Sequence, residues 1–218
     1  LAETMVRIGS LSGKKFSAVI TDMDQPLGNY IGNALEVEEA IDVLAGRTEG
    51  DLKTVALTLG AHILRNAGVV KTVDEGIERL NEKIRSGEGL RKFAEMIASQ
   101  GGDSRVTEDT SLLPHAPKRI ELRADKDGWL GSIVTSDVGN AAKLLGAGRE
   151  KKTDELDLSV GLIMKKRVGD PVHRGDVLAE LHVGEKSDSV GAYNLLKGAI
   201  AISDIPVPRP QLIHSVVE

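Results

Sequence analysis

The sequence predicts an α/β protein in two parts, with a strand and several helices over residues 1–112 and a compact β-rich module over residues 113–218. Three observations predict this arrangement. Helix-start signals recur before residue 110, Pro114 and Pro117 mark a linker, and short β-type runs separated by turns follow it. A chain of 218 residues can bury such cores without disulfides, and this chain contains no cysteine.

The first part reads as one strand among helices. The apolar run at residues 16–23 suits a strand buried on both faces, as in a parallel sheet. Capping signatures at Asn33–Glu36 and Thr72–Glu75 each predict the start of a helix. The predicted helices cover residues 2–8, 34–44, 51–66, 73–87 and 90–99. Because the chain begins without methionine and inside a predicted helix, we expect it to be a fragment of a longer protein.

The second part reads as strands and turns with two helices. The helices are predicted over residues 140–145 and 190–201. The strands are predicted over residues 119–124, 129–135, 156–164, 167–168, 177–183 and 212–217.

Composition argues against nucleic-acid and membrane partners. The net charge is −5 and only 2% of the residues are aromatic, so neither a basic surface nor a base-stacking platform is expected. No apolar run approaches the roughly 20 residues that cross a bilayer, and the acidic start is unlike a signal peptide. We expect a cytoplasmic protein, with which the absence of cysteine is compatible.

One long segment carries a family resemblance. Residues 21–41, TDMDQPLGNYIGNALEVEEAI, resemble the T/S-D-M-x-Q-P-L-G-x-x-x-G-N-A-L-E-V-x-E-A-I pattern of pyrimidine-nucleoside phosphorylases, a family that includes thymidine phosphorylase. Further similar segments follow in order: LRKFAEMIASQGGD at 90–103, GAGRE at 146–150, DLSVGLIMKKRVGD at 157–170 and PVPRPQLI at 206–213.

The resemblance implies both a fold and an activity. Residues 1–112 would be the C-terminal portion of the family's mixed-sheet α/β domain, and residues 113–218 its small β-rich barrel-sandwich domain. The intact protein would convert uridine, thymidine or deoxyuridine and phosphate to the free base and (deoxy)ribose 1-phosphate, as a homodimer without an organic cofactor. The sequence does not separate a preference for uridine from one for thymidine.

The residues that would carry this chemistry are not found in the chain. Family members are about twice this length, and their preceding half supplies the phosphate loop, the base-binding residues and a histidine. Gly146-Ala147-Gly148 follows a helix and lacks a Lys-Ser/Thr partner, so it reads as a turn. We therefore assign no catalytic or substrate-binding residue here, and expect the 218-residue chain alone to be inactive.

A metal site is predicted at Leu27, Tyr30 and Glu39. Backbone carbonyls in a Gly-containing loop beside one helical carboxylate form an oxygen-only site of low charge, which suits a weakly demanding cation better than zinc. The resemblance implies a potassium ion held by the main-chain oxygens of Leu27 and Tyr30 and by the Glu39 carboxylate, with further ligands in the preceding half. Tyr30 replaces the small residue usual in the family. The alternative is that Glu39 lies on a solvated helix face.

Two Gly-Asp turns, at residues 169–170 and 175–176, resemble the hairpins of biotinyl and lipoyl carrier domains. A carrier presents a lysine just after the second turn, whereas residues 177–184 of this chain contain no lysine, and Lys165 and Lys166 lie before both turns. The family's own C-terminal sandwich accounts for the pattern without a modified lysine.

The histidines and one pair of aspartates are weaker candidates. No two histidines have the spacing of a zinc motif, so all five are expected to be surface or capping residues: His62, His115, His173, His182 and His214. Asp22 and Asp24 lie at the C-terminal end of a predicted strand, where α/β sites gather, but they receive no role.

Two other readings remain open from the sequence. The chain could be a non-catalytic truncated paralogue that serves as an interaction module. It could also belong to an AMP phosphorylase or another transferase of the same superfamily.

Overall fold

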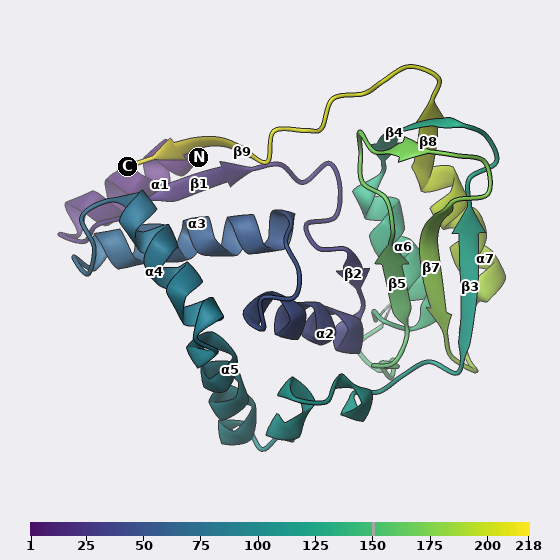
Figure 1. The fold of residues 1–218 in the computed structure, drawn as a ribbon, viewed down its shortest axis with the longest axis horizontal. Coiled ribbons are helices and arrows are strands. Elements are labelled where there is room, and N and C mark those ends of the chain that lie inside the picture. The colour runs from purple at the N-terminus through teal and green to yellow at the C-terminus, as the bar shows by residue number, and fades with distance from the viewer. Residues whose placement is uncertain (150) are drawn as a thin grey trace. The chain divides into compact units, whose positions relative to one another are not determined.

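The computed structural model describes residues 1–149 and 151–218, and the chain forms two compact units (Figure 1). Neither unit is one continuous stretch. Unit 1 comprises Leu1–Asp22, Asp42–Gly101 and Gln211–Glu218, and unit 2 comprises Met23–Ile41 and Gly102–Pro210. These units are defined by compactness alone, so the family domain boundary predicted between residues 112 and 113 stays a prediction. Residue 150, the last of the GAGRE segment, lies outside the described residues.

Unit 1 is built of helices and one antiparallel strand pair. Strand β1 (Ala18–Thr21) pairs with β9 (Ile213–Val217), so the two ends of the described chain lie side by side (Figure 1). The helices are α1 (Ala2–Leu11), α3 (Asp51–Asn66), α4 (Val73–Arg85) and α5 (Glu88–Ser99), which confirms the predicted helices of this region.

The predicted environment of the first strand is wrong. Within the described residues β1 is paired on one side only, and that pairing is antiparallel. Ile20 is 38% exposed, so the strand is not buried on both faces. An apolar run predicts a strand, but it contains no information about how many neighbours that strand has.

The two predicted capping signatures differ in outcome. At α4 the box forms as expected: Thr72 Oγ1 accepts from the Glu75 amide at 3.1 Å and Glu75 Oε2 accepts from the Lys71 amide at 2.9 Å. At α2 (Asn33–Leu44) the prediction of an Asn33 cap is wrong, because Asn33 is already helical and its side-chain Nδ2 donates to the Ala147 carbonyl at 3.0 Å.

The described part of unit 2 contains two antiparallel sheets, the first part of α2, two short 3-10 helices (Ser104–Thr107 and Thr110–Leu112) and two further α-helices. The larger sheet has the order β2-β5-β7-β3, formed by β2 (Tyr30–Ile31), β5 (Gly161–Met164), β7 (Val177–Val183) and β3 (Lys118–Arg123). The smaller has the order β6-β4-β8, formed by β6 (Pro171–Val172), β4 (Gly128–Ile133) and β8 (Ile200–Ser203). As far as the structure describes the chain, neither sheet closes into a barrel.

Helices α6 (Thr135–Leu145) and α7 (Ser189–Ala199) pack against each other and lie along one face of the larger sheet (Figure 1). With residues of both sheets they enclose a continuous apolar core, in which Leu130, Leu162 and Leu181 of the sheets and Leu196 of α7 are each 0% exposed. The predicted mixed α/β fold with a β-rich C-terminal part is confirmed.

Several predicted boundaries in unit 2 are corrected. The short helix predicted at 140–145 begins at Thr135, and the long strand predicted at 156–164 is confined to Gly161–Met164. Residues 167–168 do not form a strand. They belong to a turn, because the Asp170 carboxylate accepts from the Arg167 amide at 2.8 Å. Among the described helices, none is long and apolar enough to cross a membrane.

Candidate cation-binding loop

The first part of the segment that carries the family resemblance, residues 23–31, folds into a loop that enters the larger sheet of unit 2. The Met164 amide donates to the Asn29 carbonyl at 2.8 Å, and Tyr30 pairs with Ile163. In an antiparallel ladder the residue next to a hydrogen-bonded pair turns its own amide and carbonyl away from the partner strand. The Tyr30 carbonyl therefore points away from β5, as a ligand to another group must.

Glu39 on α2 faces this loop. Its side chain is 7% exposed, with Oε1 accepting from the Asn29 amide at 2.7 Å and Oε2 from the Tyr30 amide at 3.2 Å. A Cβ at Gly28 would lie 2.2 Å from Glu39 Oε2, so the loop approaches the carboxylate only because residue 28 has no side chain. The alternative of a solvated Glu39 is wrong, whereas Glu36 is exposed.

The Leu27 carbonyl faces a basic side chain. Arg167 Nη2 lies 3.4 Å from the Leu27 oxygen, and Nη1 lies 3.2 Å from the Gly28 oxygen and 3.5 Å from Asn29 Oδ1. The turn that carries Arg167 is fixed to the same loop, because Gln25 Oε1 accepts from the Val168 amide at 3.1 Å. The loop before α2 and the turn after β5 thus hold each other.

Sequence reasoning missed Arg167 and Gln25. Both lie in segments that carry the family resemblance. A local sequence pattern cannot predict the hydrogen bond between Gln25 and Val168, because these residues are 143 positions apart. Their importance follows only from the pairing of β2 with β5.

The donor set fits a monovalent cation. Glu39 is a buried carboxylate that accepts from two backbone amides, and within the described residues no basic side chain is paired with it. A buried negative charge without a counter-ion is costly, which favours a cation nearby. Carbonyl and carboxylate oxygens are ligands for potassium. The structure thus brings Leu27, Tyr30 and Glu39 to one loop and the helix beside it.

The two aspartates Asp22 and Asp24 lie in different units. In unit 1 the Asp22 amide donates to the Leu212 carbonyl at 2.9 Å, and Asp22 Oδ1 is 3.9 Å from His214 Nε2. In unit 2 Asp24 lines a cavity of about 530 Å³ together with Met23, Ser132, Thr135 and other residues. Neither arrangement assigns a chemical role.

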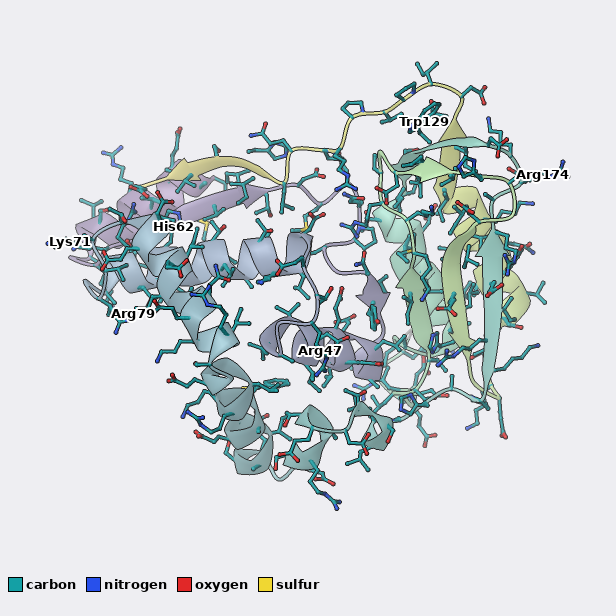
Figure 2. The ribbon with its side chains drawn as sticks, in the orientation of Figure 1. Arg47, His62, Lys71, Arg79, Trp129 and Arg174 are labelled. Atoms are coloured by element: carbon teal, nitrogen blue, oxygen red, sulfur yellow. The ribbon has the colours of Figure 1, made fainter. Side chains whose placement is uncertain are left out.

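The prediction that all five histidines are surface or capping residues is wrong for two of them. His62, on α3 (Figure 2), is 6% exposed, and its Nδ1 lies 3.5 Å from Glu218 Oε1 without the alignment of a hydrogen bond. His182 on β7 is 3% exposed, and its Nε2 is buried without a hydrogen-bond partner in the described residues. Burial, reinforced by the Arg119 charge, lowers the pKa of His182.

Both Gly-Asp segments form turns, but neither closes a hairpin between paired strands, because β5 and β7 belong to the larger sheet and β6, which lies between them in the chain, belongs to the smaller one. The Asp176 carboxylate accepts from the His173 amide at 3.1 Å, and this bond lowers the pKa of Asp176. Arg174 extends outward from this turn (Figure 2). The lysines upstream are held in ion pairs, Lys165 with Glu180 and Lys166 with Asp176 at 3.1 Å. Neither lysine is presented at the tip of a hairpin, as a carrier domain requires.

Comparison with known proteins gives two family matches and close relatives. Residues 1–90 match the a/b domain of the glycosyl transferase family, and residues 129–203 match the pyrimidine nucleoside phosphorylase C-terminal domain. Pyrimidine-nucleoside phosphorylases of Staphylococcus aureus strains USA300 and NCTC 8325 are each 42% identical to the chain over 217 residues, which is 100% of this chain and 50% of the relative. The chain spans about half the length of the curated relatives it matches.

Proposed function

The chain belongs to the pyrimidine-nucleoside phosphorylase family, and we propose that the full-length protein transfers the pentose of a pyrimidine nucleoside to phosphate. A phosphate oxygen forms a bond to C1′ of the sugar while the C1′–N1 bond breaks. The base leaves with that electron pair and takes up a proton. The products are the free pyrimidine and (deoxy)ribose 1-phosphate.

The observation that carries this proposal is the 42% identity along the whole chain to proteins named for that activity. The reaction needs an anion site for phosphate and donors that stabilise charge on the departing base. No residue of this chain is proposed to supply either. Its contribution is structural: the loop of residues 25–31, the helix α2 behind it, and the β-rich sheets that hold the loop.

The direct test uses full-length protein with uridine, thymidine or deoxyuridine, with and without phosphate. Chromatographic release of uracil or thymine is expected only when phosphate is present. Release of base without phosphate would indicate a hydrolase, and release of adenine from AMP would indicate an AMP phosphorylase. A protein that acts on none of these substrates would favour a non-catalytic paralogue and overturn the proposal.

We also propose that a potassium ion binds beside the loop, held by the Leu27 and Tyr30 carbonyls and the Glu39 carboxylate. The support is the buried Glu39 carboxylate with no paired basic side chain in the described residues, and the outward direction of the Tyr30 carbonyl. When bound, the ion would supply a fixed positive charge that draws the loop oxygens together. The chain's own contribution is to hold these oxygens in place through the β2–β5 pairing.

The Glu39→Gln variant of the full-length protein tests this site. It is expected to lose most of the potassium-dependent rise in the midpoint of thermal unfolding, because the only charged ligand proposed in this chain becomes neutral. Glu38→Gln on the same helix is the matched control and should respond to potassium like the parent. An unchanged potassium response in Glu39→Gln would show that the ion, if it binds, binds elsewhere.

The proposal extends to a cytoplasmic homodimer, which the family resemblance implies. Light scattering of the full-length protein at several concentrations measures its mass in solution. A mass equal to that of one chain at all concentrations would contradict the dimer.

A further inference from the structure

Arg167 is a fixed positive charge beside the loop that is proposed to hold potassium. Its guanidinium lies 3.2 Å from the Gly28 carbonyl oxygen and 3.4 Å from that of Leu27, with Asn29 Oδ1 at 3.5 Å. These three oxygens face one cationic group. One of them, the Leu27 oxygen, is also a proposed ligand of the ion.

Hydrogen bonds from two consecutive backbone amides, those of Arg167 and Val168, hold the turn that carries this guanidinium. The Arg167 amide donates to Asp170 Oδ2 at 2.8 Å and the next amide, of Val168, donates to Gln25 Oε1. Gln25 and Val168 are 8% and 7% exposed, so this bond is shielded from water. The turn that carries Arg167 is therefore hydrogen-bonded to the same loop that the Arg167 guanidinium contacts. Movement of the side chain away from the loop would break its contacts with the Leu27 and Gly28 carbonyls.

Two positive charges that share a carbonyl oxygen affect each other in opposite ways. The guanidinium attracts the carbonyl dipoles and so orders the loop when no ion is bound. It also repels a second cation a few ångströms away, with an energy that is appreciable in a half-buried site. A neutral side chain at this position would remove both effects together.

We propose that Arg167 is a positioning residue that serves as a built-in cationic partner of the loop carbonyls, and that it thereby reduces both the affinity of the loop for potassium and the dependence of the loop on it. This inference rests on the potassium site proposed above. It goes beyond that site because it assigns Arg167, which is not a ligand, a role in setting how tightly the loop binds potassium and how much the stability of the loop depends on the ion.

The test compares the full-length parent with its Arg167→Met variant in a potassium chloride titration, with choline chloride keeping the ionic strength constant. The readout is the midpoint of thermal unfolding. Without potassium the variant is expected to unfold at a lower temperature than the parent. Added potassium should raise the unfolding midpoint of the variant by more than that of the parent. The potassium concentration that gives half of this rise should be lower than in the parent by about threefold or more, because the guanidinium no longer repels the ion.

Arg209→Met is the matched control. Arg209 also pairs with Asp170 of the same turn, at 2.7 Å, but its side chain is 77% exposed and has no contact with the loop carbonyls among those described. The Arg209→Met change removes the same charge as Arg167→Met and should leave the potassium-dependent rise in the unfolding midpoint unchanged. Arg167→Lys, which keeps the charge and loses the planar fork, should fall between the parent and Arg167→Met.

A purely structural Arg167 predicts a different result. In that case the Arg167→Met midpoint would be lowered equally at every potassium concentration, with the same half-saturating concentration as the parent. That outcome, or the absence of any potassium response in both proteins, overturns the inference. If Arg167→Met does not give soluble protein, Arg167→Gln is titrated in its place. Phosphorolysis is assayed separately, so a protein without that activity would overturn the proposed function while the titration still decides the role of Arg167.

Discussion

Polar groups serve different purposes in the loop of unit 2 and in the α4–α5 helices of unit 1. In the loop region Gln25 and Glu39 are buried, and their acceptors are matched to particular backbone amides. On α4 and α5 the charged side chains form ion pairs at the surface, such as Arg85 with Glu78, whose side chains are 60% and 62% exposed. Buried partners cannot be replaced by water and exposed partners can. Substitutions should therefore be costly in the first region and nearly silent in the second.

The largest expected effect is for Gly161→Ala, at the start of β5. Gly161 has φ +156°, and a Cβ there would lie 2.1 Å from the Ile31 carbonyl oxygen of the neighbouring strand. The backbone would have to separate β2 from β5, and we expect a loss of roughly 3 kcal/mol or more in the free energy of unfolding. Denaturant unfolding measures this loss.

Gly139→Ala is the control for this change. Gly139 lies in α6, and nothing within 4 Å would meet its Cβ, so alanine should stabilise the helix by up to about 1 kcal/mol. Equal effects at the two glycines would mean that β2 and β5 do not approach as closely as described.

The next effect is for Gln25→Leu. The change removes the acceptor of the Val168 amide without creating a large cavity, and leaves a buried donor unsatisfied. The expected loss is about 1–3 kcal/mol in the free energy of unfolding. Gln100→Leu, at the exposed end of α5, should change it by no more than about 0.5 kcal/mol. If Gln25→Leu were as silent as Gln100→Leu, the bond between the loop and the turn would not contribute to stability.

The buried His182 of unit 2 should make the free energy of unfolding depend on pH. Its pKa is lowered in the folded protein, chiefly by burial, so below pH of about 6.5 the unfolded chain takes up a proton that the folded one resists. The stability due to the neutral imidazole is complete above that pH and declines as the pH falls, by at most about 1.4 kcal/mol per pH unit. Urea unfolding of His182→Leu should show a weaker decline between pH 7 and pH 5 than the parent.

His173→Leu provides the comparison for this pH profile. The His173 side chain is 81% exposed, so its removal takes away no buried imidazole, and the acid-induced loss of stability should be reduced less than in His182→Leu. If the two variants gave the same profile, burial of His182 would not be the cause of the acid sensitivity.

The smallest effect is for Lys92→Ala on α5. Lys92 forms an ion pair with Glu95, but the Lys92 side chain is 77% exposed and water can take its place. We expect no measurable change in the midpoint of thermal unfolding at physiological salt. A clear fall would mean that surface pairs in unit 1 contribute as much as the buried bonds of unit 2.

Local signals predicted much of the fold. The capping box at Thr72 and Glu75, the end of α3 at Asn66 and the strand at 177–183 all formed where the sequence placed them, because they depend on neighbouring residues and on short-range periodicity. The candidate site was predicted in part. The motif located Leu27, Tyr30 and Glu39, but a solvated Glu39 remained an open alternative until its burial was seen.

The sequence by itself indicated the family, the helices of unit 1 and the strand at 177–183, and it located the loop that carries the proposed cation ligands. It did not predict the short strands β2, β6 and β8. Only the tertiary structure decided that β1 pairs with β9, that His62 and His182 are buried, and that Arg167 lies against the Leu27 and Gly28 carbonyls. The physical reason is range. Caps, turns and periodicity are set by residues a few positions apart, whereas strand partners, burial and the charge beside the loop depend on contacts between segments more than a hundred residues apart.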